Sequence, residues 1–138
     1  MILAKYLVSY LLTAVIFFAL DMVWLGLVAK DMYRKELGPL LKSQPDWVAA
    51  GIFYLLFILG TLIFAVYPAV GKHSLTTAVV LGALFGFFTY ATYDLTNLAT
   101  LKDWPLMISL VDIAWGTFLT STVSAAGYFI VSFVERQL

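Results

Sequence analysis

The sequence predicts an all-α membrane protein: a bundle of four transmembrane helices with a short amphipathic segment between helices 1 and 2. Of its 138 residues, 63% are hydrophobic and 12% are charged, and the mean hydropathy is +0.98. A soluble domain of this size does not have so apolar a composition. Four stretches reach the length of about 20 residues that a helix needs to cross hydrocarbon about 30 Å thick.

The four helices are expected at residues 6–29, 47–69, 75–101 and 105–134, so that one domain fills residues 1–138. The first stretch is longer than the apolar region of a signal peptide and has no clear cleavage site, so we expect a mature helix. Asp46, Ser74 and Asp103 are expected to cap the helices that follow them. Proline and glycine mark the breaks, at Gly38-Pro39, Gln44-Pro45, Pro68, Gly71 and Trp104-Pro105.

The first connection is the only long one, and its apolar residues are interspersed with basic ones. The apolar residues indicate an amphipathic piece that lies on the membrane surface; they are Met32, Tyr33, Leu37, Leu40 and Leu41, and the basic ones are Lys30, Arg34, Lys35 and Lys42. The other connections are short, so consecutive helices should be antiparallel neighbours. Five basic residues on the long-loop side against three on the other predict that both termini lie outside and that the long loop is cytoplasmic.

Three aspartates interrupt the apolar stretches at nearly the same depth. With a rise of ~1.5 Å per residue, Asp21 lies ~12 Å from the loop end of the first helix, and Asp94 and Asp112 lie ~10 Å from the ends of the third and fourth helices. Tyr54 enters the same layer from the second helix. A carboxylate in hydrocarbon costs at least ~2.5–3.5 kcal/mol, so three in one layer indicate a common site.

Rows of residues at four-residue intervals turn these acids inward. Small residues allow close helix contact in lipid, so two rows are the expected packing faces: Gly82, Gly86, Tyr90 and Asp94 in the third helix, and Asp112, Gly116, Thr120 and Ser124 in the fourth. Trp24 follows Asp21 by three residues and Trp115 follows Asp112 by three, which should bring an indole N–H beside each carboxylate. The predicted polar site therefore comprises Asp21, Asp94, Asn97 and Asp112, lined by Trp24, Tyr54, Tyr90, Tyr93 and Trp115.

No lysine or arginine lies at that depth, so three ionised carboxylates would repel one another. A shared proton relieves this repulsion, and so does a cation bound by Asp21, Asp94 and Asp112. Three functions remain open. The site binds a proton, a cation or a small polar group, with a link to transport; or it belongs to an intramembrane enzyme acting on a lipid or a lipid-soluble substrate; or the acids only fasten the helices. No catalytic residue is assigned.

Several chemistries are excluded by composition. The chain has no cysteine and only one histidine, His73, which excludes disulfides, thiol nucleophiles and bis-histidine haem. We expect no cofactor. Without a run of like charges, nucleic acid is not an expected partner. Membrane lipids are expected partners, and the substrate stays open. The Gly82-x-x-x-Gly86 spacing permits a homo-oligomer contact as well as an intrachain one.

Several segments closely resemble a family of bacterial membrane proteins catalogued as domain of unknown function 2177. The most specific is Tyr90-Ala91-Thr92-Tyr93-Asp94-Leu95-Thr96-Asn97, and the others are Leu20-Asp21-Met22-Val23-Trp24, Phe53-Tyr54, Trp104-Pro105 and Val111-Asp112-Ile113-Ala114-Trp115. The resemblance covers essentially the whole chain. It implies a multi-pass protein of the bacterial inner membrane, and it assigns no substrate.

Overall fold

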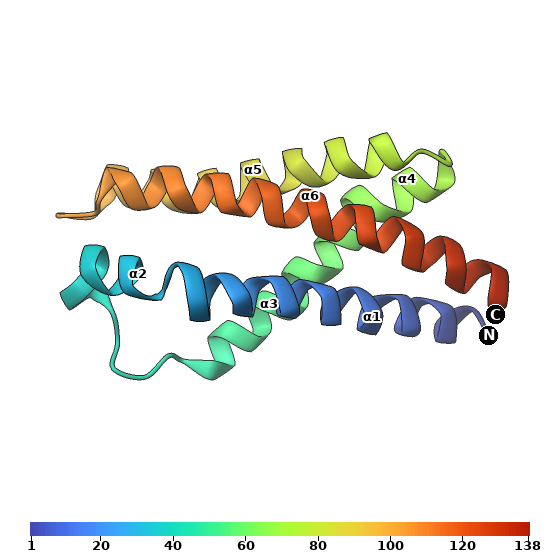
Figure 1. Ribbon diagram of the computed structural model, residues 1–138, viewed down its shortest axis with the longest axis horizontal. Helices are drawn as coiled ribbons and strands as arrows, with labels where there is room; N and C mark the ends of the chain where they lie inside the picture. Colours follow the sequence, from blue (N-terminus) through green and yellow to red (C-terminus); the bar gives the residue numbers. More distant parts are fainter.

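The computed structural model describes residues 1–138 and contains helices but no strands. Four helical spans are long and apolar enough to cross a membrane: Ile2–Val28, Trp47–Gly71, Leu75–Thr100 and Leu106–Gln137. The predicted all-α membrane fold is therefore confirmed. The two termini lie together at one end of the molecule, and the long connection lies at the other (Figure 1).

Two of the four spans contain a π-helical turn. The first span consists of α1 (Ile2–Val23) and η1 (Trp24–Val28), and the second of α3 (Trp47–Thr61), η3 (Leu62–Val66) and α4 (Tyr67–Gly71). Pro68 explains the second turn, since it has no N–H group for a helical hydrogen bond and its ring crowds the preceding turn. The wider turn at η1 begins three residues after Asp21, and π turns of this kind are frequent at functional sites. Neither turn was expected from the sequence.

The remaining elements are α2 (Lys30–Leu37), the short η2 (Gly38–Leu40), α5 (Leu75–Thr100) and α6 (Leu106–Gln137). Asp46 and Ser74 cap α3 and α5 as predicted, because their side chains accept hydrogen bonds from first-turn N–H groups. The predicted cap at Asp103 is wrong. Pro105 precedes α6, and Asp103 lies in a turn with a φ of 60°. Proline keeps the preceding residue extended, so the helix cannot start as early as Asp103 predicts.

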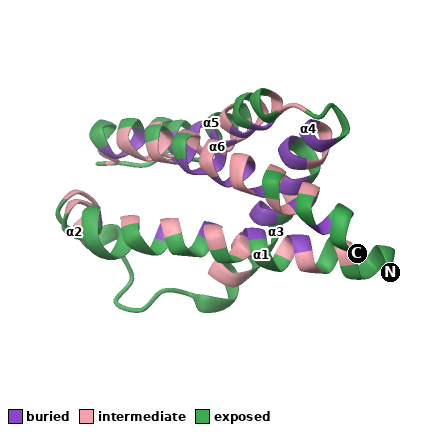
Figure 2. Ribbon diagram, turned by 45° about the vertical axis from the view of Figure 1, so that its right-hand side comes forward, coloured by how far each residue is buried: buried purple, intermediate pink, exposed green.

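Helices α5 and α6 pack against each other in the most extensive contact between two helices in the molecule. Gly82 lies against Ser124, and Gly86 lies against Thr120 and the backbone of α6, so closely that a Cβ atom on either glycine would overlap them. The ring of Tyr90 likewise lies directly on Gly116. The two predicted rows of small residues are thus the packing faces. Figure 2 shows buried positions where the helices meet and exposed positions on their outer sides.

Helix α3 crosses the other helices at an angle and packs against them in the core (Figure 1). Five buried side chains from α1, α3 and α6 form its largest cluster: Phe17, Phe57, Ile58, Leu119 and Val123. Beyond this cluster, η3 and α4 contact α5 and α6, whereas the first half of α3 diverges from α5 toward the long-loop end (Figure 1). This divergence leaves room for a cavity at the depth of the aspartates.

Candidate functional site

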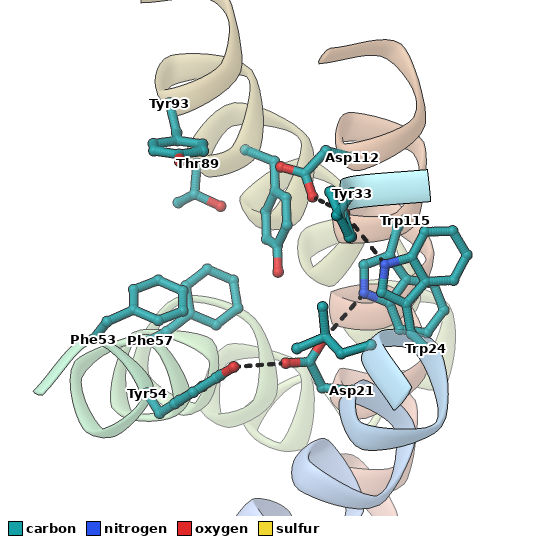
Figure 3. Close-up of a pocket in the computed structure, with 12 residues that line it drawn as sticks. Asp21, Trp24, Tyr33, Phe53, Tyr54, Phe57, Thr89, Tyr93, Asp112 and Trp115 are labelled. Carbon is teal, nitrogen blue, oxygen red and sulfur yellow. Dashed lines mark hydrogen bonds between the residues drawn. The ribbon is translucent and has the colours of Figure 1, made fainter. Parts of the chain in front are cut away.

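A cavity of about 520 Å³ opens between the diverging helices and is lined mainly by aromatic side chains. This volume lies in the range of small-molecule sites. All four spans and α2 contribute to the lining, which consists of Asp21, Trp24, Leu25, Tyr33, Phe53, Tyr54, Phe57, Thr89, Tyr90, Tyr93, Asp112 and Trp115. The two aspartates and both tryptophans lie across the cavity from Phe53, Thr89 and Tyr93 (Figure 3).

Asp21 is only 5% exposed and is held from two sides. The hydroxyl of Tyr54 donates to its Oδ2 atom at 3.0 Å, and the indole Nε1 of Trp115 donates to its Oδ1 atom at 3.3 Å. The ring of Tyr54 is fixed in turn by edge contacts with Phe17 and Phe18. Both oxygens of this buried carboxyl group therefore have a donor, as buried polar groups require.

Asp112 is half-buried and receives its hydrogen bond from outside the four spans. The hydroxyl of Tyr33, in α2, donates to Asp112 Oδ1 at 2.7 Å, which is the length of a charge-assisted bond. The Nε1 atom of Trp24 lies 3.4 Å from the same hydroxyl and donates to it. Burial, with the neighbouring Asp112 carboxylate second, raises the pKa of Tyr33 above its ordinary value of 10.0. Tyr33 is therefore a neutral donor at physiological pH.

The two tryptophans stack face to face, with ring centroids 4.5 Å apart and planes 6° apart. The prediction that each indole accompanies the carboxylate of its own helix is wrong, because Trp115 binds Asp21 and Trp24 reaches Asp112 through Tyr33. The opposite chain directions of α1 and α6 explain this exchange of partners. A step of three residues leads toward the long loop in α1 and away from it in α6, so each tryptophan reaches the level of the other helix's aspartate.

Tyr33 was not among the predicted site residues, although it was recognised as part of an amphipathic segment. The sequence carried one usable signal: a phenol on the apolar face of a short helix that follows directly after the end of the first span. Only the tertiary structure shows that α2 brings this phenol against Asp112. The position of α2 on a membrane surface stays a prediction.

Asp94 lies deeper between α5 and α6 and does not line the first cavity. It is 0% exposed, and neither of its carboxyl oxygens has a hydrogen-bond donor. A smaller cavity of about 310 Å³ adjoins it, and Asp112, Tyr33, Tyr93 and Leu25 line both cavities. In space, Asp112 therefore lies between the other two aspartates, because it lines both cavities.

A hydrogen bond to the backbone of Asp94 fixes its position next to α6. Its carbonyl oxygen accepts a hydrogen bond from Ser109 at 3.1 Å, and Ser109 accepts one from the indole of Trp104 at 3.0 Å. Trp104 also makes an edge contact with Tyr93, the residue before Asp94. These contacts tie the loop end of α5 to the first turn of α6.

Of the nine predicted site residues, seven line the larger cavity, and Asp94 lines the adjoining one. Asn97 lines neither; it lies about one turn beyond Tyr93 in α5. The cation considered for the three aspartates has no matching site, since no three acidic, histidine or cysteine side chains gather closely enough to hold a metal ion. Their distribution over two adjoining cavities explains why.

The lining of the larger cavity is acidic and aromatic, with no basic side chain. Its donors to the carboxyl groups are neutral phenol and indole groups, which hold the acids without balancing their charge. Phe53 and Tyr93 are 46% and 57% exposed, and they stand where α3 and α5 diverge. A ligand of positive charge and apolar surface would meet complementary groups on all sides of such a cavity.

Comparison with known proteins gives one family. Residues 6–129 match the family described as "Predicted membrane protein (DUF2177)", and this description names no activity. No curated protein and no solved structure is similar to the chain.

Proposed function

Since this chain belongs to the DUF2177 family of predicted membrane proteins, we propose its function from its cavity: it binds a small organic cation within the membrane, as a step in moving it across. The observation that carries the proposal is the lining of the larger cavity. Asp21 and Asp112 supply negative charge, eight aromatic rings surround them, and no lysine, arginine or histidine is present.

An organic cation fits this lining better than a metal ion. Hard metal ions take six to eight oxygen ligands at short range, and no group of three suitable side chains exists. An alkylated ammonium or phosphonium ion instead binds to the faces of aromatic rings. The stacked pair of Trp24 and Trp115 and the rings of Tyr54 and Tyr90 supply such faces next to the carboxyl groups.

We propose that the ligand enters from the bilayer. Support comes from the exposed rim residues Phe53 and Tyr93, which lie in the membrane-spanning part of α3 and α5. A lipid-soluble cation concentrates in the membrane, so a lateral opening would shorten its path to the acids. The proposed setting is the bacterial inner membrane, with the long loop in the cytoplasm and both termini outside.

The test uses tetraphenylphosphonium and tetraphenylborate, which have similar shapes and opposite charges. Purified protein in lipid nanodiscs is titrated with each ion, and binding is measured by calorimetry and by quenching of tryptophan fluorescence. The cation should bind saturably and the anion should not. Asp21→Asn should weaken binding of the cation at least tenfold, because it removes a charge in a poorly hydrated site. Trp47→Phe, which alters an exposed tryptophan outside the cavity, is the matched control.

Transport is tested separately in proteoliposomes loaded with tetraphenylphosphonium. Efflux should exceed that of empty liposomes and fall with Asp21→Asn, while Trp47→Phe should leave it unchanged. Equal binding of both ions would contradict the binding proposal. Binding without protein-dependent efflux would leave a binding protein and remove the transport step. If the Asn variants lose stability while wild type binds neither ion, the acids only fasten the helices.

A second candidate is an enzyme acting on a lipid or a lipid-soluble substrate. It is favoured by the two phenol and carboxyl pairs, Tyr54 with Asp21 and Tyr33 with Asp112, which face one cavity and could exchange protons with a bound molecule. Incubation of the protein with a membrane lipid extract should then yield a new lipid by mass spectrometry, absent with Asp21→Asn. An extract unchanged by wild type would exclude this reading.

A further inference from the structure

The smaller cavity has a feature that cation binding in the larger one does not use. Asp94 lines it, is 0% exposed, and has no donor for either carboxyl oxygen. A buried charge without a partner is unstable, and a carboxyl group in such a place either finds a counter-charge or takes up a proton. No lysine, arginine or histidine lines either cavity, so no counter-charge is supplied by the chain.

The side chains that line the smaller cavity together with Asp94 come from several neighbouring elements. Asp112 of α6, Tyr33 of α2 and Tyr93 of α5 line the same cavity, and the other neighbours there are apolar or indole groups. Two carboxyl groups can form a hydrogen bond only if one of them carries a proton. A proton between Asp94 and Asp112 would therefore give the isolated carboxyl group its missing partner.

We infer that Asp94 and Asp112 share one proton while the larger cavity is empty, and that an organic cation bound there releases this proton toward the long loop. The inference rests on the proposed function for the ligand, but the shared proton itself does not. Asp112 connects the two events, since it lines both cavities.

The geometry around Asp112 supports the exchange. Tyr33 donates to Oδ1 of Asp112 at 2.7 Å and leaves Oδ2 without a donor in the chain, so Oδ2 is free to interact with Asp94. A cation in the larger cavity favours the ionised form of Asp112 and competes for the same oxygen atoms. Release of one proton for each monovalent cation leaves the net charge of the site unchanged, because the cation beside Asp112 replaces the shared proton as the counter-charge of the two carboxyl groups.

The smaller cavity offers the released proton a route to water. Its wall includes Leu37, the last residue of α2, and Leu41, which follows η2 at the long-loop end of the molecule. By linkage, if the cation expels a proton, a proton must expel the cation equally. Such reciprocity would make the binding of the cation depend on pH, with tighter binding as pH rises.

The shared proton is tested first without ligand. Infrared spectra of the empty protein at neutral pH should contain the carbonyl band of a protonated carboxyl group. Asp94→Asn should remove this band, and Asp112→Asn should shift its frequency, because the proton is then held by Asp94 alone. Asp103→Asn is the matched control: Asp103 is exposed in the same end of the molecule, and asparagine tolerates its positive φ. Absence of the band from wild type, its persistence in Asp94→Asn, or an unchanged frequency in Asp112→Asn would overturn the inference.

Proton release is then measured by titrating the protein with tetraphenylphosphonium in two buffers of different ionisation enthalpy. Wild type and Asp103→Asn should release one proton per cation, and their affinity should rise about tenfold per pH unit over the range of exchange. Asp94→Asn should bind the cation without releasing a proton. Binding by wild type without proton release overturns the exchange and leaves the proposed function intact. Failure of all binding overturns the proposed function, and the infrared band then decides the shared proton alone.

Discussion

The two donors to Asp21 should depend on each other energetically. Tyr54→Phe removes one hydrogen bond of 3.0 Å and keeps the ring against Phe17 and Phe18. Hydrogen bonds between membrane helices average ~0.6 kcal/mol and reach ~1.7 kcal/mol. Because this bond is made to a carboxyl group, we expect a loss of about 1 kcal/mol in the free energy of unfolding.

Trp115→Phe removes the other donor, whose bond of 3.3 Å is longer and weaker. It also removes the stack with Trp24, an aromatic contact that is worth about 0.5–1.5 kcal/mol. The expected loss is therefore about 1–2 kcal/mol. The double variant leaves a carboxyl group that is 5% exposed without any donor. Loss of the last partner of a buried charge costs about 3–5 kcal/mol, so the double loss should exceed the sum of the single losses by about 1–2 kcal/mol.

The assay is a double-mutant cycle of reversible unfolding, in which sodium dodecyl sulfate is added to protein in mixed micelles and helix content is followed by circular dichroism. The cycle cancels the lost tryptophan stack, since that loss occurs in both variants that lack Trp115. Repeating it in an Asp21→Asn background should bring the coupling below about 0.5 kcal/mol, the limit of additivity. Coupling below that limit in the wild-type background would refute the reasoning that Tyr54 and Trp115 jointly stabilise Asp21.

Three further predictions concern packing, pH and capping. Gly116→Ala should lower the free energy of unfolding by about 1–3 kcal/mol in the same assay and weaken cation binding, because its Cβ would displace Tyr90. Gly51→Ala, whose Cβ would contact no other atom, should be neutral or stabilising. Equal effects of the two variants would exclude the clash. Because the folded-state pKa of Tyr33 exceeds 10.0, its contribution to stability is present below that pH and is lost as pH rises through the folded-state value. Above pH 10.0, the free energy of unfolding should therefore fall less steeply with pH in Tyr33→Phe than in wild type. Parallel curves for the two proteins would contradict this. Asp46→Ala should cost about 0.5–2 kcal/mol through the lost bonds to the first turn of α3, whereas Asp46→Asn should retain most of the capping energy; equal losses would mean that the cap contributes nothing.

The length and apolar character of four stretches were enough to predict the helices and their antiparallel order. In lipid the backbone must satisfy its own hydrogen bonds, so an apolar stretch of sufficient length has little choice but to form a helix. The rows of small residues also predicted how α5 and α6 meet, because close contact in lipid depends on the absence of side-chain bulk at Gly82, Gly86 and Gly116.

Depth counting placed Asp21, Asp94 and Asp112 in one layer, but depth along a helix does not determine which side chains meet across it. Only the tertiary structure separated Asp94 into its own cavity, exchanged the tryptophan partners between α1 and α6, and brought Tyr33 back over Asp112. Each of these outcomes depends on the direction or the placement of a neighbouring helix, which spacing within a single helix does not encode. The sequence by itself determined that the acids lie inside the bundle, and the packing of five elements decided what each acid touches.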